Sequence, residues 1–228
     1  MNRVLFIGAH PDDIELGCAG TIYKYSNMGW TIGALILAEG SSSRYDDPIT
    51  SRQLIDKDKK DRKESCKRSL TNLGVSSFKF HDLPCSKLDT VPMLTINKMI
   101  EAEIREFNPE VVFTHSQVDT NKDHKLVFES TKIATRPSAF PQIRSIYCYE
   151  VLSSTECSYS DVFKPNYFVS LSREHLEKKI ESLKFYETEM KKFPNSRSAE
   201  GVEVLAKFRG IQINKNYAES FETLRSCA

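Results

Sequence analysis

The chain has 228 residues, of which 39% are hydrophobic and 28% charged, a composition that is typical of globular proteins and excludes wholesale disorder. Its 32 lysine and arginine residues nearly balance its 31 aspartate and glutamate residues, which leaves a formal charge of +1. This balance lacks the basic signature of a protein that binds nucleic acid or an anionic membrane. No apolar run approaches the roughly 20 residues of a membrane-spanning helix. We therefore expect no nucleic-acid partner and no membrane span.

Six cysteines are scattered along the chain without a C-x-x-C pair, so we interpret them as free thiols of a reducing compartment. The apolar run Val4–Ile7 is too short for a secretory signal. The expected location is the cytoplasm.

Apolar runs alternate with helical patterns from the start of the chain. The predicted elements are strands at 4–8, 31–37, 78–80 and 111–114 and helices at 15–28, 52–73, 91–107 and 125–134. This alternation predicts an α/β fold with a parallel sheet and helices on both faces.

The regular alternation of strand and helix patterns ends after Pro137. Strands are predicted at 144–151 and 167–171, the second as an antiparallel edge strand, and helices at 172–192 and 198–208. No repeat and no linker divides the chain, so residues 1–228 are expected to form a single domain.

Two polar clusters follow the first and fourth predicted strands. They are the run 9–15 (AHPDDIE) and the run 115–124 (HSQVDTNKDH). Ligands of open parallel sheets bind outside the carboxyl ends of the strands, where both runs are expected. Each run alone has a simpler explanation, since acidic residues at 12 and 13 suit a helix N-terminus and polar loops are common. Together they indicate a functional site.

A catalytic zinc ion takes three histidine or carboxylate ligands and leaves one position for water. His10 and Asp13 lie three residues apart on a turn that enters a helix, so both can face one point. His124 completes the set if the two strands are neighbours. Asp12 then remains as a free carboxylate that could take a proton from the water.

A second shell of carboxylates is also available. Asp123 or Asp119 could orient a ligand imidazole through its other ring nitrogen. Two histidines and one carboxylate also describe non-haem iron sites, so Fe²⁺ or another divalent metal is the alternative to Zn²⁺.

The runs AHPDDIELG at 9–17 and DTNKDH at 119–124 resemble the PIG-L/LmbE-like family of zinc-dependent N-acetylglucosaminyl deacetylases. The resemblance extends along nearly the whole chain, with further landmarks at 149–151, 165–168, 209–210 and 217–221. It implies a Rossmann-like three-layer α/β/α sandwich with zinc at the carboxyl ends of the strands. It also implies His10, Asp13 and His124 as metal ligands and Asp12 as the general base. Homo-oligomers are frequent in such families, so a homo-oligomer is possible, although no exposed stripe in this sequence indicates one.

One position departs from the family pattern. Many members carry histidine three residues before the last metal ligand, where this chain has Asn121. An amide can donate a hydrogen bond to an oxyanion but cannot supply a proton at neutral pH. The acid is therefore either Asp12 itself or His115, and the alternative for His115 is a loop histidine bonded to Asp119.

Residues after the second strand reach the same rim of the sheet. Arg44 resembles the family's substrate-binding arginine, and it is predicted together with Glu39 and Asp119 to contact the substrate. The alternative for Arg44 is a solvated loop cation. The mixed charge run 56–64 is interpreted as the solvated face of a helix.

The resemblance implies hydrolysis of an N-acetyl group on an amino sugar, in a glycoside or linked to a nucleotide, within polysaccharide or glycoconjugate biosynthesis. One alternative is deacetylation of a glucosamine-based low-molecular-weight thiol precursor. The other is a non-catalytic Rossmann-like nucleotide-binding protein, which the absence of G-x-G-x-x-G after the first strand disfavours.

Overall fold

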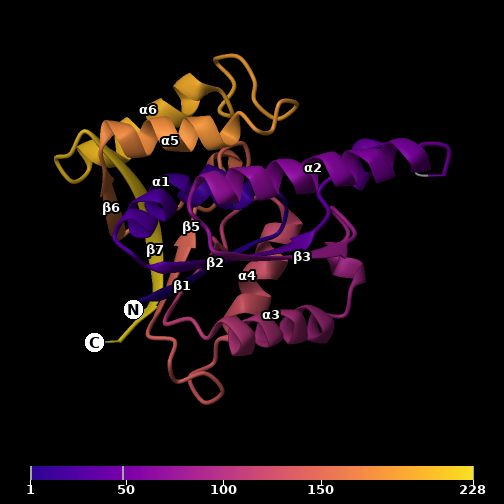
Figure 1. Cartoon of the computed structure of the whole chain (residues 1–228), viewed down its shortest axis with the longest axis horizontal. Helices are drawn as coiled ribbons and strands as arrows, with labels where there is room; N and C mark the ends of the chain where they lie inside the picture. The colour runs from indigo at the N-terminus through magenta and orange to yellow at the C-terminus, as the bar shows by residue number, and fades with distance from the viewer. Residues whose placement is uncertain (1, 48, 228) are drawn as a thin grey trace.

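Seven strands form one sheet in the computed structural model, which describes residues 2–47 and 49–227 (Figure 1). The sheet order is β3-β2-β1-β4-β5-β7-β6. The strands are β1 (Arg3–Gly8), β2 (Thr31–Ala38), β3 (Ser77–Leu83), β4 (Val111–His115), β5 (Ser145–Tyr149), β6 (Tyr167–Leu171) and β7 (Tyr217–Ser226). Strands β1 to β5 pair in parallel, whereas β7 is antiparallel to both of its neighbours. The mostly parallel sheet with an antiparallel edge is confirmed.

The strand order reverses direction between β1 and β4, because the chain moves outward through β2 and β3 and then returns to the other side of β1. This is the topological switch point, where open α/β sheets bind ligands. The two polar clusters of the sequence follow these two strands.

Helices cover both faces of the sheet, as the resemblance implies (Figure 1). One face carries α1 (Asp13–Asn27), α2 (Arg52–Asn72), α5 (Arg173–Leu183) and α6 (Ala199–Ile211). The other face carries α3 (Met93–Phe107) and α4 (Lys122–Ala134). Strand β1 shows why both layers form, since Val4 and Phe6 enter one core while Leu5 and Ile7 enter the other.

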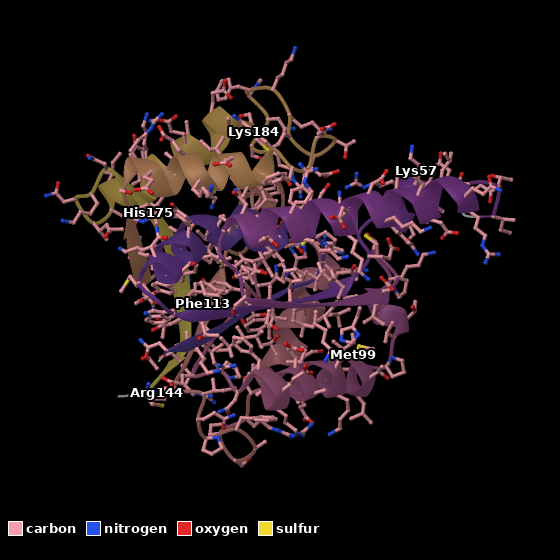
Figure 2. All side chains as sticks on the ribbon, in the orientation of Figure 1. Lys57, Met99, Phe113, Arg144, His175 and Lys184 are labelled. Carbon is pink, nitrogen blue, oxygen red and sulfur yellow. The ribbon has the colours of Figure 1, made fainter. Side chains whose placement is uncertain are left out.

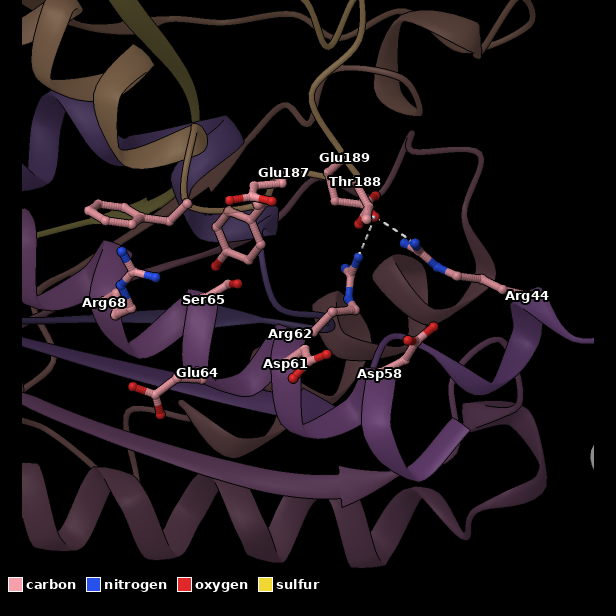
Figure 3. Close-up of a pocket in the computed structure, with 12 residues that line it drawn as sticks. Arg44, Asp58, Asp61, Arg62, Glu64, Ser65, Arg68, Glu187, Thr188 and Glu189 are labelled. Carbon is pink, nitrogen blue, oxygen red and sulfur yellow. Dashed lines mark hydrogen bonds and ion pairs between the residues drawn. The ribbon is translucent and has the colours of Figure 1, made fainter. Parts of the chain in front are cut away.

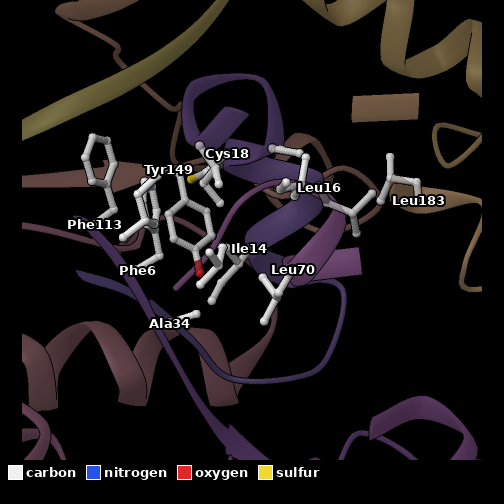
Figure 4. Close-up of a cluster of buried hydrophobic side chains, with 14 of the residues drawn as sticks. Phe6, Ile14, Leu16, Cys18, Ala34, Leu70, Phe113, Tyr149 and Leu183 are labelled. Atoms are coloured by element: carbon white, nitrogen blue, oxygen red, sulfur yellow. The ribbon is translucent and has the colours of Figure 1, made fainter. Parts of the chain in front are cut away.

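Three aromatic side chains, Phe6, Phe113 and Tyr149, lie among aliphatic residues in the core between the sheet and α1 (Figure 4). Phe6 stacks on Phe113 with ring centroids 4.7 Å apart, and the Tyr149 hydroxyl donates a hydrogen bond to the Ile7 carbonyl at 2.8 Å. Helix α1 approaches Tyr149 closely because residue 17 is glycine. A Cβ atom on Gly17 would lie 2.4 Å from Tyr149 Cδ2.

Three element predictions needed correction. The helix predicted at 172–192 ends at Leu183, because Tyr186 and Glu189 leave the helical path for buried contacts. Helix α4 begins at Lys122 and not at 125, since the Asn121 side chain caps it by accepting from the Asp123 amide at 2.9 Å. Strand β7 was not predicted, and it separates β5 from the edge strand β6.

The surface and the cysteines agree with the sequence expectations. Phe113 lies among packed side chains at the sheet, whereas Lys57 and Lys184 lie on the outside (Figure 2). All six cysteines are free thiols, as predicted. Within residues 2–47 and 49–227, no helix is both long and apolar enough to cross a bilayer.

Candidate active site

The two polar clusters meet at one edge of the sheet. Strands β1 and β4 are hydrogen-bonded parallel neighbours, with Val4 opposite Val111 and Phe6 opposite Phe113. The turn after β1 and the loop after β4 therefore start side by side. The expected juxtaposition of the two runs is present.

The turn after β1 separates two adjacent carboxylates. Asp12, the residue before α1, has a left-handed backbone with φ of 97°. A non-glycine residue in this region stores strain on the order of 1–3 kcal/mol, which the surrounding contacts must hold. The His10 amide donates to Asp13 Oδ2 at 2.7 Å and fixes that carboxylate toward the histidines. The Asp12 carboxylate instead lies against Arg62 and Arg197.

His10, Asp13 and His124 form a compact ligand group. Asp13 Oδ2 lies 3.3 Å from His10 Nδ1 and 3.2 Å from His124 Nε2. One ligand atom from each residue lies within 4.8 Å of the others, and all three residues are buried. The two nitrogens of His124 are buried without an aligned hydrogen bond, although carboxylates lie near both. A divalent cation fits this donor set and would satisfy His124 Nε2.

Two further carboxylates orient the imidazoles. Asp123 Oδ2 lies 2.9 Å from His10 Nε2, and Asp119 Oδ2 lies 3.1 Å from His124 Nδ1. Each carboxylate engages the ring nitrogen that faces away from Asp13. This arrangement selects His10 Nδ1 and His124 Nε2 as the nitrogens available to a metal.

The electrostatics of the group also favour a cation. Burial lowers the pKa of His124, but Asp13 and Asp119 outweigh burial and raise it to about 9. The pKa of His10 is likewise raised, against burial, by Asp123 and Asp13. Burial raises the pKa of Asp13, but His124 and His10 hold it well below its usual value. Positive charge among these side chains is thus strongly stabilised.

A cavity of about 190 Å³ opens over the ligand group. Of the residues predicted for the site, it is lined by His10, Asp12, Asp13, Arg44, Asn121 and His124. Arg44 lies in the 3₁₀ turn η1 (Ser42–Arg44) after β2, at the rim where the sequence places it. The remaining lining residues are Gly40, Ser43, Arg62, Cys85, Ser86, Ser153, Ser154 and Arg197.

Four other residues predicted for the site lie behind its lining. Asp123 is buried behind His10, where its carboxylate also accepts hydrogen bonds from the Ser86 and Leu88 amides. Asp119 is fully buried and, besides facing His124, accepts from the Thr155 hydroxyl at 2.6 Å.

Glu39 accepts hydrogen bonds from the backbone amides of Ser41, Ser42 and Cys85, so it ties two rim loops together. His115 is fully buried and stacks on His124 with ring centroids 4.0 Å apart. Its Nε2 accepts a hydrogen bond from the Ala9 amide at 2.9 Å. Burial, followed by repulsion from His124, lowers the pKa of His115 to about 4.

The sequence analysis missed Arg62, Arg197 and Glu189. Arg62 belongs to the charge run interpreted as a solvated helix face, yet it is only 7% exposed. Its position was the available signal, because Arg62 lies seven residues after Ile55 and four before Cys66 on the buried face of α2. Arg197 and Glu189 lie on the segment between α5 and α6, which has no comparable periodicity.

The family model for PIG-L, described as GlcNAc-PI de-N-acetylase, matches residues 5–135. The chain is 30% identical over 189 residues to the uncharacterized deacetylase YaiS of Escherichia coli K12, across 79% of this chain and 88% of that protein. It is 28% identical over 196 residues to diacetylchitobiose deacetylase of Thermococcus kodakarensis, across 83% of this chain and 70% of that protein.

The fold is also similar to a solved structure. The N,N'-diacetylchitobiose deacetylase of Pyrococcus horikoshii, in complex with its inhibitor MPG, matches with a TM-score of 0.75 at 21% identity. The match covers 98% of this chain and 84% of that one. At this identity the likeness supports the shared fold, and the chemistry must be argued from the side chains.

Proposed function

Because the chain belongs to the PIG-L family, we propose that it is a zinc-dependent hydrolase that removes an N-acetyl group from an amino sugar. The sugar would be part of a glycoside or linked to a nucleotide, in the assembly of a polysaccharide or glycoconjugate. The observation that carries the proposal is the meeting of His10, Asp13 and His124 beside the separate carboxylate of Asp12 in one cavity. Removal of N-acetyl groups from a sugar is also the activity named for the Thermococcus relative.

The donor set fits a catalytic metal. His10, Asp13 and His124 would hold a divalent ion, with Asp123 and Asp119 behind the imidazoles. Such an ion supplies a bound water of lowered pKa and polarises the acyl oxygen. Two imidazoles and one carboxylate, with room for a further ligand, are typical of catalytic zinc.

Asp12 is the candidate general base. Its Oδ2 lies 2.9 Å from Arg197 Nη1 and 3.3 Å from Arg62 Nη2. Both ion pairs use the same oxygen, so Oδ1 is left for proton transfer while the carboxylate is held in place. Asp12 would take a proton from the attacking water as the water oxygen bonds to the acyl carbon.

The leaving amine also needs a proton. Asn121 lines the cavity, and because its Oδ1 caps α4, its amide NH₂ is the group available to donate to the acyl oxygen. His115 does not line the cavity, and its Nε2 is engaged by the Ala9 amide. This geometry favours Asp12 over His115 as the acid: Asp12 returns its proton to the nitrogen as the C–N bond breaks. The products are acetate and a free amine.

Acetate release from purified protein tests the proposal. The substrates are N-acetylated sugar nucleotides, glycosides and a glucosamine-based thiol precursor, assayed before and after removal of metal by a chelator. We expect acetate from at least one substrate, loss of activity with the metal, and recovery with Zn²⁺. Elemental analysis of protein purified without added metal separates zinc from iron.

The variant Asp12→Asn separates the base from the metal site. It should lower kcat by about 10²–10⁴-fold while the protein retains its metal. Undiminished turnover would remove Asp12 from the mechanism. Nucleotide affinity that is independent of metal, without acetate release from any substrate, would instead support a nucleotide-binding protein.

A further inference from the structure

Three arginines from distant parts of the chain converge beside the ligand group. We call Arg44 of η1, Arg62 of α2 and Arg197 of the segment between α5 and α6 the arginine cluster. All three line the cavity above the histidines. Their charges are opposed by Asp12 and by one further carboxylate, that of Glu189.

Glu189 lies at the centre of the arginine cluster. Its Oε1 lies 2.5 Å from Arg44 Nη1 and 2.7 Å from Arg62 Nη1 (Figure 3). Its Oε2 lies 3.0 Å from Arg197 Nη1. Burial raises the pKa of Glu189, but the arginines, with Arg44 first, outweigh burial and lower it to about 2. The Glu189 carboxylate thus pairs with all three arginines of the cluster.

Glu189 also lies next to a second, larger cavity. This cavity has a volume of about 410 Å³, and both basic and acidic side chains line it (Figure 3). The lining residues are Arg44, Arg62, Arg68, Asp58, Asp61, Glu64, Glu187, Glu189, Ser65, Phe185, Tyr186 and Thr188. Arg44 and Arg62 line both this cavity and the smaller one over the histidines. The two cavities therefore adjoin at these arginines, where the Glu189 side chain is bound.

Arg62 retains unused hydrogen-bond donors. Its Nε and Nη1 are buried without an aligned hydrogen-bond partner in the described chain, although Nη1 lies close to Glu189. Buried donors without partners are costly, and a planar guanidinium pairs best with an oxyanion that meets two N–H groups at once. Glu189 contacts this guanidinium at only one nitrogen, so the position is incompletely filled.

We propose that the substrate carries an anionic group, a phosphate or a carboxylate, next to the acetamido sugar, and that this group replaces Glu189 in the arginine cluster. The proposal rests on the deacetylase function proposed above and specifies its substrate class. When Glu189 turns away, Asp12 is the one remaining carboxylate among the described residues that is ion-paired with these arginines, and a mono- or dianion would replace the lost negative charge. The remainder of the substrate would extend into the larger cavity.

The segment that carries Glu189 is anchored in the core by Tyr186, whose hydroxyl donates to Glu15 Oε1 at 2.6 Å. In this proposal the Glu189 side chain rotates away from the arginines while this anchor stays in place.

Matched substrates test the proposal. The methyl and carboxymethyl glycosides of N-acetylglucosamine differ by one carboxylate, and N-acetylglucosamine 1-phosphate supplies the phosphate. We expect kcat/KM for an anionic substrate to exceed that for the methyl glycoside by about tenfold or more, as a charge-assisted pair allows. The anion, carboxylate or phosphate, that gives the larger increase in kcat/KM identifies the anionic group that the site prefers. Equal kcat/KM for the charged and neutral substrates would overturn the proposal and leave the deacetylase function intact.

Substitutions test whether the arginine cluster causes the preference for anionic substrates. Arg44→Met should reduce the anionic-to-neutral ratio of kcat/KM about tenfold. Glu189→Gln should raise the same ratio on the order of tenfold, because the competing carboxylate is lost. Glu181→Gln is the matched control, since Glu181 is exposed on α5, pairs with Lys178 and lines neither cavity, and it should leave the ratio unchanged. A ratio unaffected by Arg44→Met and Glu189→Gln would contradict the assignment.

Calorimetric binding of the same three compounds gives a readout independent of turnover. If no compound loses acetate, the deacetylase proposal fails for this class. The anionic inference is then judged by affinity alone. Tighter binding of an anionic compound that Arg44→Met abolishes supports the inference, and equal affinities for charged and neutral compounds overturn it.

Discussion

Replacement of Asp119 by asparagine tests how the Asp119 carboxylate orients the imidazole of His124. Asp119 is fully buried, and its Oδ2 lies 3.1 Å from His124 Nδ1 while accepting hydrogen bonds from the Ser154 and Thr155 hydroxyls. Asparagine keeps the size but removes the charge and replaces one acceptor with an NH₂ donor. His124 Nδ1 would then have to accept, so its proton moves to Nε2. Nε2 is the nitrogen that faces Asp13 and the cavity.

The expected loss is in metal affinity. Removal of a carboxylate behind a ligand imidazole lowers metal affinity by about 10–100-fold, which corresponds to about 1.4–2.7 kcal/mol. Asp123→Asn should weaken binding through His10 by a similar factor. Asp123→Asn also loses one of the two oxygens that accept from the Ser86 and Leu88 amides, so its unfolding free energy should fall as well.

Competition with a chromogenic chelator at fixed pH measures the affinity, and circular dichroism of the metal-free protein confirms the fold. Asp82→Asn is the control, because the Asp82 side chain is 71% exposed and lies 3.9 Å from its partner Lys63. Metal affinity for Asp119→Asn within about twofold of the wild type, together with a raised KM for the sugar, would refute this reasoning. That result would place Asp119 at the substrate, as the sequence pattern suggests.

Three other substitutions test the packing and the charges around the site. Gly17→Ala should lower the free energy of unfolding, measured in urea, by about 1–3 kcal/mol, because its Cβ would lie 2.4 Å from Tyr149 Cδ2. An unchanged urea midpoint would show that α1 can move away from Tyr149 at no cost. Arg62→Met should cost about 1.5–3 kcal/mol by the same measurement, since it removes the most buried of the arginines paired with Asp12 and Glu189, while Arg197 remains beside both carboxylates. A loss below about 1 kcal/mol would contradict the burial of that ion pair. The pKa of Glu189, lowered from 4.5 to about 2, means that its ion pairs contribute stability above pH 4.5 and lose it as the pH falls toward 2. The difference in unfolding free energy between the wild type and Glu189→Gln should therefore widen by about 2 kcal/mol from pH 3 to pH 6, and a constant difference would contradict the lowered pKa.

The sequence predicted the sheet and the site where local patterns were strong. The apolar runs at β1 and β4 each end in a polar cluster, and parallel pairing of the two strands brings His10, Asp13 and His124 together. Strand β7 gave no such signal, because its buried residues include the polar Glu219 and Ser220. Glu219 is buried by pairing with Lys179 at 2.6 Å, a contact between residues 40 positions apart.

Tertiary contacts also ended α5 early and built the arginine cluster. No helix breaker precedes Pro194, so the helical pattern of 172–192 predicts a longer helix than the one that ends at Leu183. After Leu183 the chain leaves the helical path, and Tyr186 makes a buried hydrogen bond to Glu15 where further helical turns were predicted. Arg62 and Arg197 were missed because charged residues are mostly solvated, and their common partner Glu189 is identified only by the folded chain.

Diffraction from crystals of the metal-loaded protein, recorded at the absorption edge of the bound metal, tests the proposed metal site most directly. We predict one anomalous peak in contact with His10 Nδ1, Asp13 and His124 Nε2. The contradicting result is the absence of a peak among these residues. A peak on the neighbouring group of Cys85, Asp123 and His10 alone would contradict it equally.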